Sequence, residues 1–115
     1  MDRDPVATNP RLYRVVMENE AVRVLEYRDR PGDRTTPHDH PDSVMVTLSS
    51  FRRRLHQDDR SADVSLESGQ VRWLAAQGHA GENIGDTETH VIFVELKAGA
   101  AHSAADVEVL GPTEG

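Results

Sequence analysis

The chain has 115 residues, enough for one small domain with a single hydrophobic core. Acidic residues outnumber basic ones by 20 to 13, and the resulting net charge of −7 argues against a nucleic acid as a partner. Cysteine is absent, which excludes disulfides, thiolate ligands and a cysteine nucleophile. Because there is neither a long apolar run nor a leader of the secretory type, we expect a cytoplasmic protein that does not interact with a membrane.

Large apolar side chains are scarce. Apolar residues make up 37 % of the chain and aromatic residues only 4 %. The core must therefore be completed by many Val, Leu and Ala side chains, or by burial between subunits. For this reason we expect a homodimer.

Short segments with a hydrophobic period near two, separated by turn residues, predict β-strands along most of the chain. No segment between residues 11 and 97 has the pattern of a long amphipathic helix. In chain order the expected strands are 12–17, 21–27, 43–48, 51–56, 62–66, 70–74 and 89–96. Strands this short and this numerous are typical of an all-β sandwich or barrel.

The same strand pattern predicts one domain, flanked by an N-terminal segment and a C-terminal tail. We expect a mobile N-terminal segment over residues 1–10, a barrel over 11–97 and a C-terminal tail over 98–115. The tail is rich in Ala, Gly and acidic residues, and within it residues 107–110 have the pattern of one added edge strand.

Two histidines separated by one residue, His38 and His40, carry the clearest chemical signal in the chain. In an extended strand, residues i and i+2 project from the same face, so both imidazoles can face one cavity. A third histidine from a distant strand would complete a set of nitrogen ligands for a transition metal with open positions. His79 is the candidate for this third ligand.

The residues around this pair resemble the cupin family. The first cupin motif is written G-x5-H-x-H-x3/4-E-x6-G, and Gly32, His38 and His40 match its opening half. The resemblance extends over roughly residues 12 to 97. It implies an all-β fold of the double-stranded β-helix (jelly-roll) type and a mononuclear metal site inside the barrel.

The second cupin motif and the end of the first are matched less completely. The second motif, G-x5-P-x-G-x2-H-x3-N, is echoed by Gly69, His79 and Asn83. Where the glutamate ligand of the first motif would fall, the chain has Val44 after three residues and Met45 after four, and neither binds a hard cation. The resemblance therefore supports a three-histidine site without the usual glutamate.

Five further polar residues are candidates for the surroundings of the metal. Asp42 is a candidate hydrogen-bond partner of a ligand imidazole, and the Gln77 amide oxygen a candidate weak fourth ligand. Asn83 is expected to cap a turn rather than to ligate. His90 is a candidate spare ligand or acid–base group if it faces the cavity, and Arg54 a candidate partner for an anionic substrate. The alternative for Arg54 is an ordinary solvated strand face.

The charge of the predicted site indicates what it would bind. Three neutral imidazoles leave the +2 charge of a divalent ion uncompensated, which favours a small anionic, chelating organic ligand at the open positions. Imidazole ligands suit iron, zinc, nickel and manganese alike. With iron, the resemblance implies a dioxygenase, which is the interpretation we favour. The alternatives are a non-redox, metal-dependent isomerase or cyclase, and a non-catalytic cupin that binds a small molecule. The sequence singles out no catalytic residue beyond the metal ligands.

Overall fold

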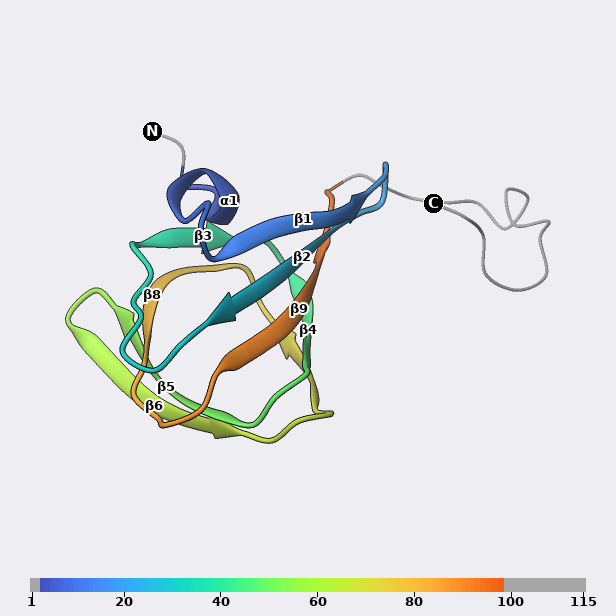
Figure 1. The fold of residues 1–115 in the computed structure, drawn as a ribbon. Helices are drawn as coiled ribbons and strands as arrows, with labels where there is room; N and C mark the ends of the chain where they lie inside the picture. The colour runs from blue at the N-terminus through green and yellow to red at the C-terminus, as the bar shows by residue number, and fades with distance from the viewer. Residues whose placement is uncertain (1–2, 99–115) are drawn as a thin grey trace.

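The computed structural model describes residues 3–98, which form one short helix and nine strands (Figure 1). In chain order these elements are α1 (Pro5–Thr8), β1 (Tyr13–Glu18), β2 (Val22–Asp29), β3 (His38–His40), β4 (Ser43–Thr47), β5 (Phe51–Gln57), β6 (Arg60–Leu66), β7 (Val71–Leu74), β8 (Gln77–Asn83) and β9 (Thr89–Leu96).

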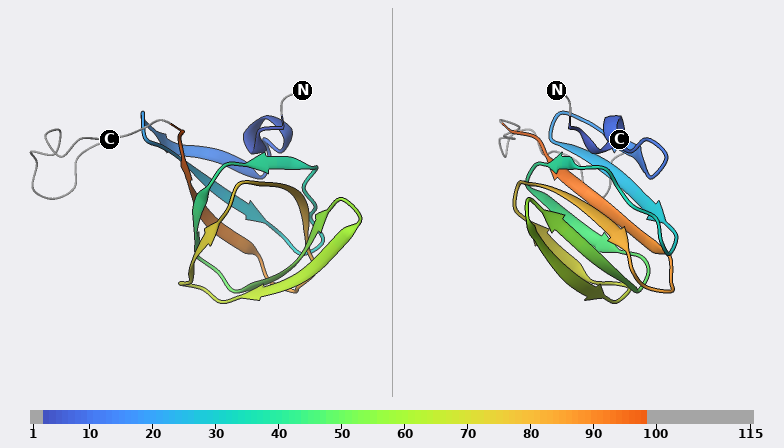
Figure 2. Two further views of the ribbon diagram at one scale, coloured as in Figure 1. Left: turned by 180° about the vertical axis from the view of Figure 1, so that it is seen from behind. Right: turned by 90° about the vertical axis from the view of Figure 1, so that its left-hand side faces the viewer.

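The strands form two antiparallel sheets that face each other across a common interior (Figure 2). One sheet has the order β1-β2-β9-β4-β7 and the other the order β3-β8-β5-β6. The chain changes sheet at every connection except those between β1 and β2 and between β5 and β6. This is a jelly-roll barrel, so the predicted all-β fold is confirmed.

The hydrophobic core lies mainly against the five-stranded sheet. Alternate residues of its strands point inward, as the predicted period of two requires. The buried apolar residues are Tyr13, Leu25, Tyr27, Met45, Phe51, Val91 and Phe93. Only Phe51 comes from the four-stranded sheet, where the polar residues His38, His40 and Arg53 are also buried. The interior therefore combines an apolar core on the five-stranded sheet with buried polar side chains on the four-stranded sheet.

The strand β8 was not predicted, because its sequence, Gln77–Asn83, is rich in Gly and polar residues. Its backbone is held on both sides, by β3 along one edge and by β5 along the other. This pairing supplies the hydrogen bonds that local sequence preference does not indicate. The segment around His79, which resembles a simple turn, is therefore a central strand.

We expected a mobile segment over residues 1–10. In the structure, the second half of this segment contacts the rest of the domain. Asp4 caps α1, its side chain accepting hydrogen bonds from two backbone N–H groups of the first turn. Asn9 is buried, and its side-chain amide bonds the backbone of Thr36 in both directions, at 2.8 and 3.2 Å. These bonds attach the segment to the chain just before β3.

The predicted edge strand over residues 107–110 and nearly all of the predicted tail over 98–115 lie outside the described residues. Within residues 3–98, no helix is long and apolar enough to span a membrane.

Candidate metal centre

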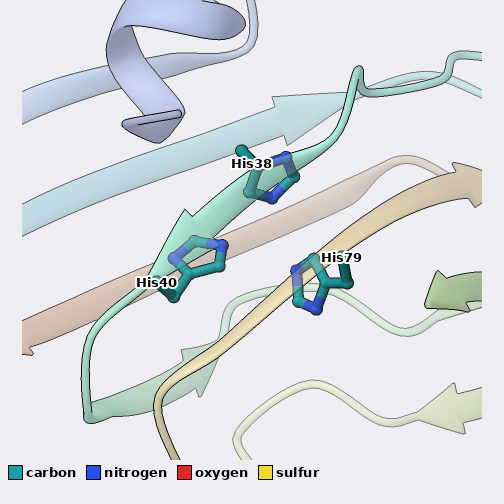
Figure 3. Close-up of side chains that lie close together, drawn as sticks. All are labelled: His38, His40 and His79. Atoms are coloured by element: carbon teal, nitrogen blue, oxygen red, sulfur yellow. The ribbon is translucent and has the colours of Figure 1, made fainter. Parts of the chain in front are cut away.

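His38, His40 and His79 come together inside the barrel (Figure 3). His38 and His40 project from the same face of β3, and His79 is the direct cross-strand partner of His38 on β8. One ring nitrogen of each histidine lies within 4.8 Å of one nitrogen of each of the others. Asp39, between the first two, is exposed on the opposite face of β3. The predicted convergence of three histidines from two distant segments is therefore present in the structure.

The Nδ1 atoms of His38 and His79 each face an oxygen atom of the protein. Nδ1 of His38 lies 2.8 Å from the backbone oxygen of Thr36. Nδ1 of His79 lies 3.0 Å from the side-chain oxygen of Gln77. An oxygen acceptor at this distance holds the ring proton on Nδ1 and leaves the lone pair on Nε2. Gln77, which we predicted in the surroundings of the metal, therefore lines the cavity and contacts a candidate ligand ring through its side-chain oxygen.

His40 has the corresponding partner in a carboxylate. Its Nδ1 lies 3.3 Å from Oε2 of Glu95, which is buried on β9. Glu95 is itself paired with Arg23, whose Nη2 lies 2.8 Å from Oε1. A histidine held by a carboxylate in this way is typical of metal sites. The sequence analysis missed Glu95, although an acidic residue in phase with Val91 and Phe93 on an apolar strand was a usable signal.

The protein environment keeps two of these rings neutral. Burial lowers the pKa of His38 from 6.5 to about 4. Burial, followed by the charges of the two neighbouring histidines, lowers the pKa of His79 to about 3. At neutral pH both rings are therefore in the unprotonated form that binds metal ions.

The side chain of Tyr13, on β1, also lies next to two of these histidines. Its hydroxyl oxygen lies 3.2 Å from Nε2 of His38 and 3.3 Å from Nε2 of His40. Burial raises the pKa of this phenol above its usual value. Tyr13 belongs to the hydrophobic core, and an aromatic residue in an expected strand gives no separate sign of a polar role in the sequence. The hydroxyl group makes this core residue part of the candidate site.

A cavity of about 450 Å³ adjoins the histidines. Its walls include Val64 and Leu66 of β6 and Trp73 and Leu74 of β7, the edge strands of the two sheets. Trp73, on the edge strand β7, is 58 % exposed. A volume of this size and a mainly apolar lining suit a small organic molecule.

Arg53 and Arg72 line the cavity, whereas Arg54, the arginine that we predicted, does not. Arg53 is buried beside the core residue Phe51 on the inner face of β5, and its Nη1 lies 2.5 Å from Oδ2 of Asp29. A Cβ atom on Gly81 would lie 2.9 Å from Nη2 of Arg53, so this glycine makes room for the guanidinium group. Arg54, one residue along the strand, points outward and pairs with an exposed carboxylate.

His90 and Asp42 also lie away from the cavity, which corrects both predictions. Val91 and Phe93 take the inward positions of β9, so His90 lies on the outer face of the sheet, where its Nε2 is 2.7 Å from Oε2 of Glu26. Asp42 accepts a hydrogen bond of 2.8 Å from the backbone N–H of Ala76 and contacts no ligand imidazole. It ties the start of β4 to the β7–β8 connection.

Asn83 has the turn-capping role that we predicted. Its side-chain oxygen accepts a hydrogen bond of 3.0 Å from the backbone N–H of Gly85, and its Nδ2 donates to the backbone oxygen of Thr87 at 2.8 Å. Nδ2 also lies 3.1 Å from Oδ1 of Asp29, which links the turn to the buried ion pair of Arg53.

Of the two positions at which the motif glutamate would fall, Met45 faces the cavity. It is buried and lines the cavity wall, while Val44 is half-buried in the other phase of β4. This inward position of β4 therefore carries a thioether in place of a carboxylate.

No protein-family model and no curated protein matches the chain. Among solved structures, the chain is similar to a cupin domain from Bordetella pertussis, with 30 % identity, a TM-score of 0.71, and 76 % of this chain and 93 % of that chain covered. A double-stranded β-helix protein from Klebsiella pneumoniae matches at 22 % identity and a TM-score of 0.59, with 76 % of each chain covered. A cupin superfamily protein from Desulfitobacterium hafniense matches at 17 % identity and a TM-score of 0.55, covering 74 % of this chain and 75 % of that one. The last two similarities concern the fold alone.

Proposed function

The chain belongs to the cupin superfamily, and we propose that it binds one divalent transition-metal ion through Nε2 of His38, His40 and His79. The observation that carries this proposal is the orientation of the three rings. Each Nδ1 faces an oxygen acceptor, so each Nε2 carries the lone pair that a metal ion would bind, and the three rings meet at one wall of a cavity. Three imidazole nitrogens and open positions on the cavity side suit iron, zinc, nickel or manganese.

We propose that the partner of this ion is a small anionic organic molecule. The buried carboxylates around the site already have cationic partners, because Asp29 pairs with Arg53 and Glu95 with Arg23. Histidine binds metal ions in its neutral form. The protein therefore does not neutralise the positive charge of the ion, which favours an anionic ligand in the cavity. The apolar cavity walls limit competition from water.

The reaction that we propose is a dioxygenation, with iron(II) as the ion. Bound iron(II) would supply the electron-transfer chemistry with O₂ that no side chain of the site can supply. The histidines would hold the ion, and the cavity walls formed by β6 and β7 would enclose an organic anion next to it. A non-redox isomerase or cyclase and a non-catalytic binder would use the same arrangement without O₂.

The test uses the full chain loaded with iron(II) without oxygen. Acetylacetone is added as a small chelating anion, and its binding is followed by visible absorption before O₂ uptake is measured. We expect binding of the anion and O₂ consumption only when the anion is present. Binding without O₂ uptake for any metal would refute the dioxygenase and support an isomerase or binder, whereas no binding would refute the anionic ligand.

We also propose that the protein is a homodimer, supported by the exposed apolar residues of the edge strand β7. Val71 is 64 % exposed and Trp73 is 58 % exposed, and both lie on a strand that pairs on one side only. Exposed apolar edges of this kind are prone to pair with another chain. Sedimentation of the wild-type protein and of Val71→Lys tests the proposal, and a wild-type monomer at micromolar concentration would contradict it.

A further inference from the structure

We propose that Tyr13 is the fourth protein ligand of the metal ion and that its phenolate oxygen replaces the carboxylate missing from β4. This inference rests on the proposed metal site of His38, His40 and His79. It adds an oxygen ligand from β1, a strand that contributes nothing to either sequence motif.

The position of the hydroxyl oxygen fits a coordination position. Two ligand atoms bound to one ion at about 2.1 Å lie about 3.0 Å apart when they are at right angles and about 3.4 Å apart in a tetrahedron. The Tyr13 oxygen lies 3.2 Å from Nε2 of His38 and 3.3 Å from Nε2 of His40. Both distances fall within this interval, so an ion that binds the two nitrogens would also be within reach of the oxygen.

The hydrogen bonds of Tyr13 cannot persist once an ion is bound. The hydroxyl contacts the Nε2 atoms of both histidines, and it makes no other hydrogen bond with residues 3–98. An ion bound by His38 and His40 takes up the two nitrogen lone pairs that the phenol faces. The phenol oxygen then faces the ion itself, and ligation gives this buried polar atom a partner.

The ring of Tyr13 is held in place by its neighbours. Tyr13 is 4 % exposed and is paired across the strands with Tyr27, whose ring centroid is 4.6 Å away. The ring of Phe93 packs on it at 6.0 Å. Because the ring cannot swing away without disturbing the core, its oxygen stays next to the two nitrogens.

The charge of the site is consistent with this ligand. Met45, at the inward position of β4, offers only a weak thioether acceptor. On binding, the phenol of Tyr13 forms one oxygen–metal bond and releases one proton to water, so the site changes from +2 to +1. One positive charge remains for an anionic ligand in the cavity.

The test is the visible spectrum of the iron(III) form. Tyrosinate bound to iron(III) gives a phenolate-to-iron charge-transfer absorption, which imidazole and carboxylate ligands do not give. The chain has two tyrosines, Tyr13 and Tyr27. Tyr27 donates to Asp29 and accepts from Arg53, so it is already satisfied. Tyr27→Phe is therefore the matched control for Tyr13→Phe.

We expect a charge-transfer band in the wild-type protein and in Tyr27→Phe after loading with iron(II) and oxidation by ferricyanide. We expect Tyr13→Phe to bind iron without the band. Stoichiometric iron(III) without a band in the wild-type protein, or a band that survives Tyr13→Phe, would overturn the inference while leaving the three-histidine site intact. If no iron binds at all, the metal site and the inference both fail. The wild-type spectrum decides even if a variant does not fold.

A second measurement uses zinc, which has no such band. Loss of a hydrogen-bond partner of a metal ligand weakens metal binding roughly 10- to 100-fold. We expect the loss of zinc affinity in Tyr13→Phe to be at least this large. Equal zinc affinities for Tyr13→Phe and the wild-type protein would overturn ligation by this residue.

Discussion

Replacing Arg53 by Met removes one charge of a buried ion pair while keeping a long side chain on the inner face of β5. The carboxylate left behind, Asp29, is completely buried, and it loses a guanidinium nitrogen that lies 2.5 Å away. Breaking one partner of such a pair costs about 3–5 kcal/mol, because the remaining charge has neither water nor a counter-ion. In a domain of this size the loss corresponds to a fall of roughly 10–20 °C in the melting temperature.

The assay is urea unfolding of the metal-free protein, followed by far-ultraviolet circular dichroism. We expect Arg53→Met to lower the urea concentration at the midpoint of unfolding strongly. The slope of the unfolding free energy against urea concentration should not change, since the surface exposed on unfolding stays the same. The matched control is Arg54→Met, on the same strand, whose exposed side chain pairs with Asp63. Its midpoint should remain close to that of the wild-type protein. Equal losses for the two variants would refute the inward position of Arg53.

Three further predictions concern the metal site. Because His38 and His79 have pKa values below the 6.5 of the unfolded chain, they contribute stability above pH 6.5 that is lost as the pH falls toward about 4. The metal-free protein should lose on the order of 2–4 kcal/mol between pH 7 and pH 5 in urea unfolding, and an unchanged midpoint would contradict this. Met45→Glu should shift metal preference toward manganese and iron and Val44→Glu should not, whereas identical competition profiles would refute the inward position of Met45. Glu95→Gln should weaken zinc binding by about 10- to 100-fold in a chelator competition assay, and wild-type affinity would refute its role in orienting the ring.

The features that the sequence predicted are those with short-range signals. Alternating apolar residues indicated most strands of the five-stranded sheet, because one face of each strand is buried. The spacing of His38 and His40 placed both on one face of a strand. His79 could be added only through the motif resemblance, because its pairing with His38 joins segments about 40 residues apart in sequence.

The features that the sequence did not predict depend on contacts between distant strands. Tyr13 and Glu95 reach the site only because β1 and β9 belong to the sheet that faces the histidines. The inward position of Arg53 follows from the burial of its carboxylate partner, Asp29, which lies 24 residues away in sequence. The helix α1 has only four residues, and its place is fixed by the hydrogen bonds of Asn9 with a distant loop.

The most direct test of the proposed site is the metal content of the protein, purified without a histidine tag, dialysed in turn against iron(II), zinc, nickel and manganese, and analysed by mass spectrometry. We predict close to one ion per chain for the wild-type protein and for His90→Ala, whose ring lies on the outer face of the barrel. His38→Ala, His40→Ala and His79→Ala should each lose the ion while remaining folded by circular dichroism. A folded wild-type protein that takes up none of the four metals, or an ion that survives all three substitutions, would contradict the account.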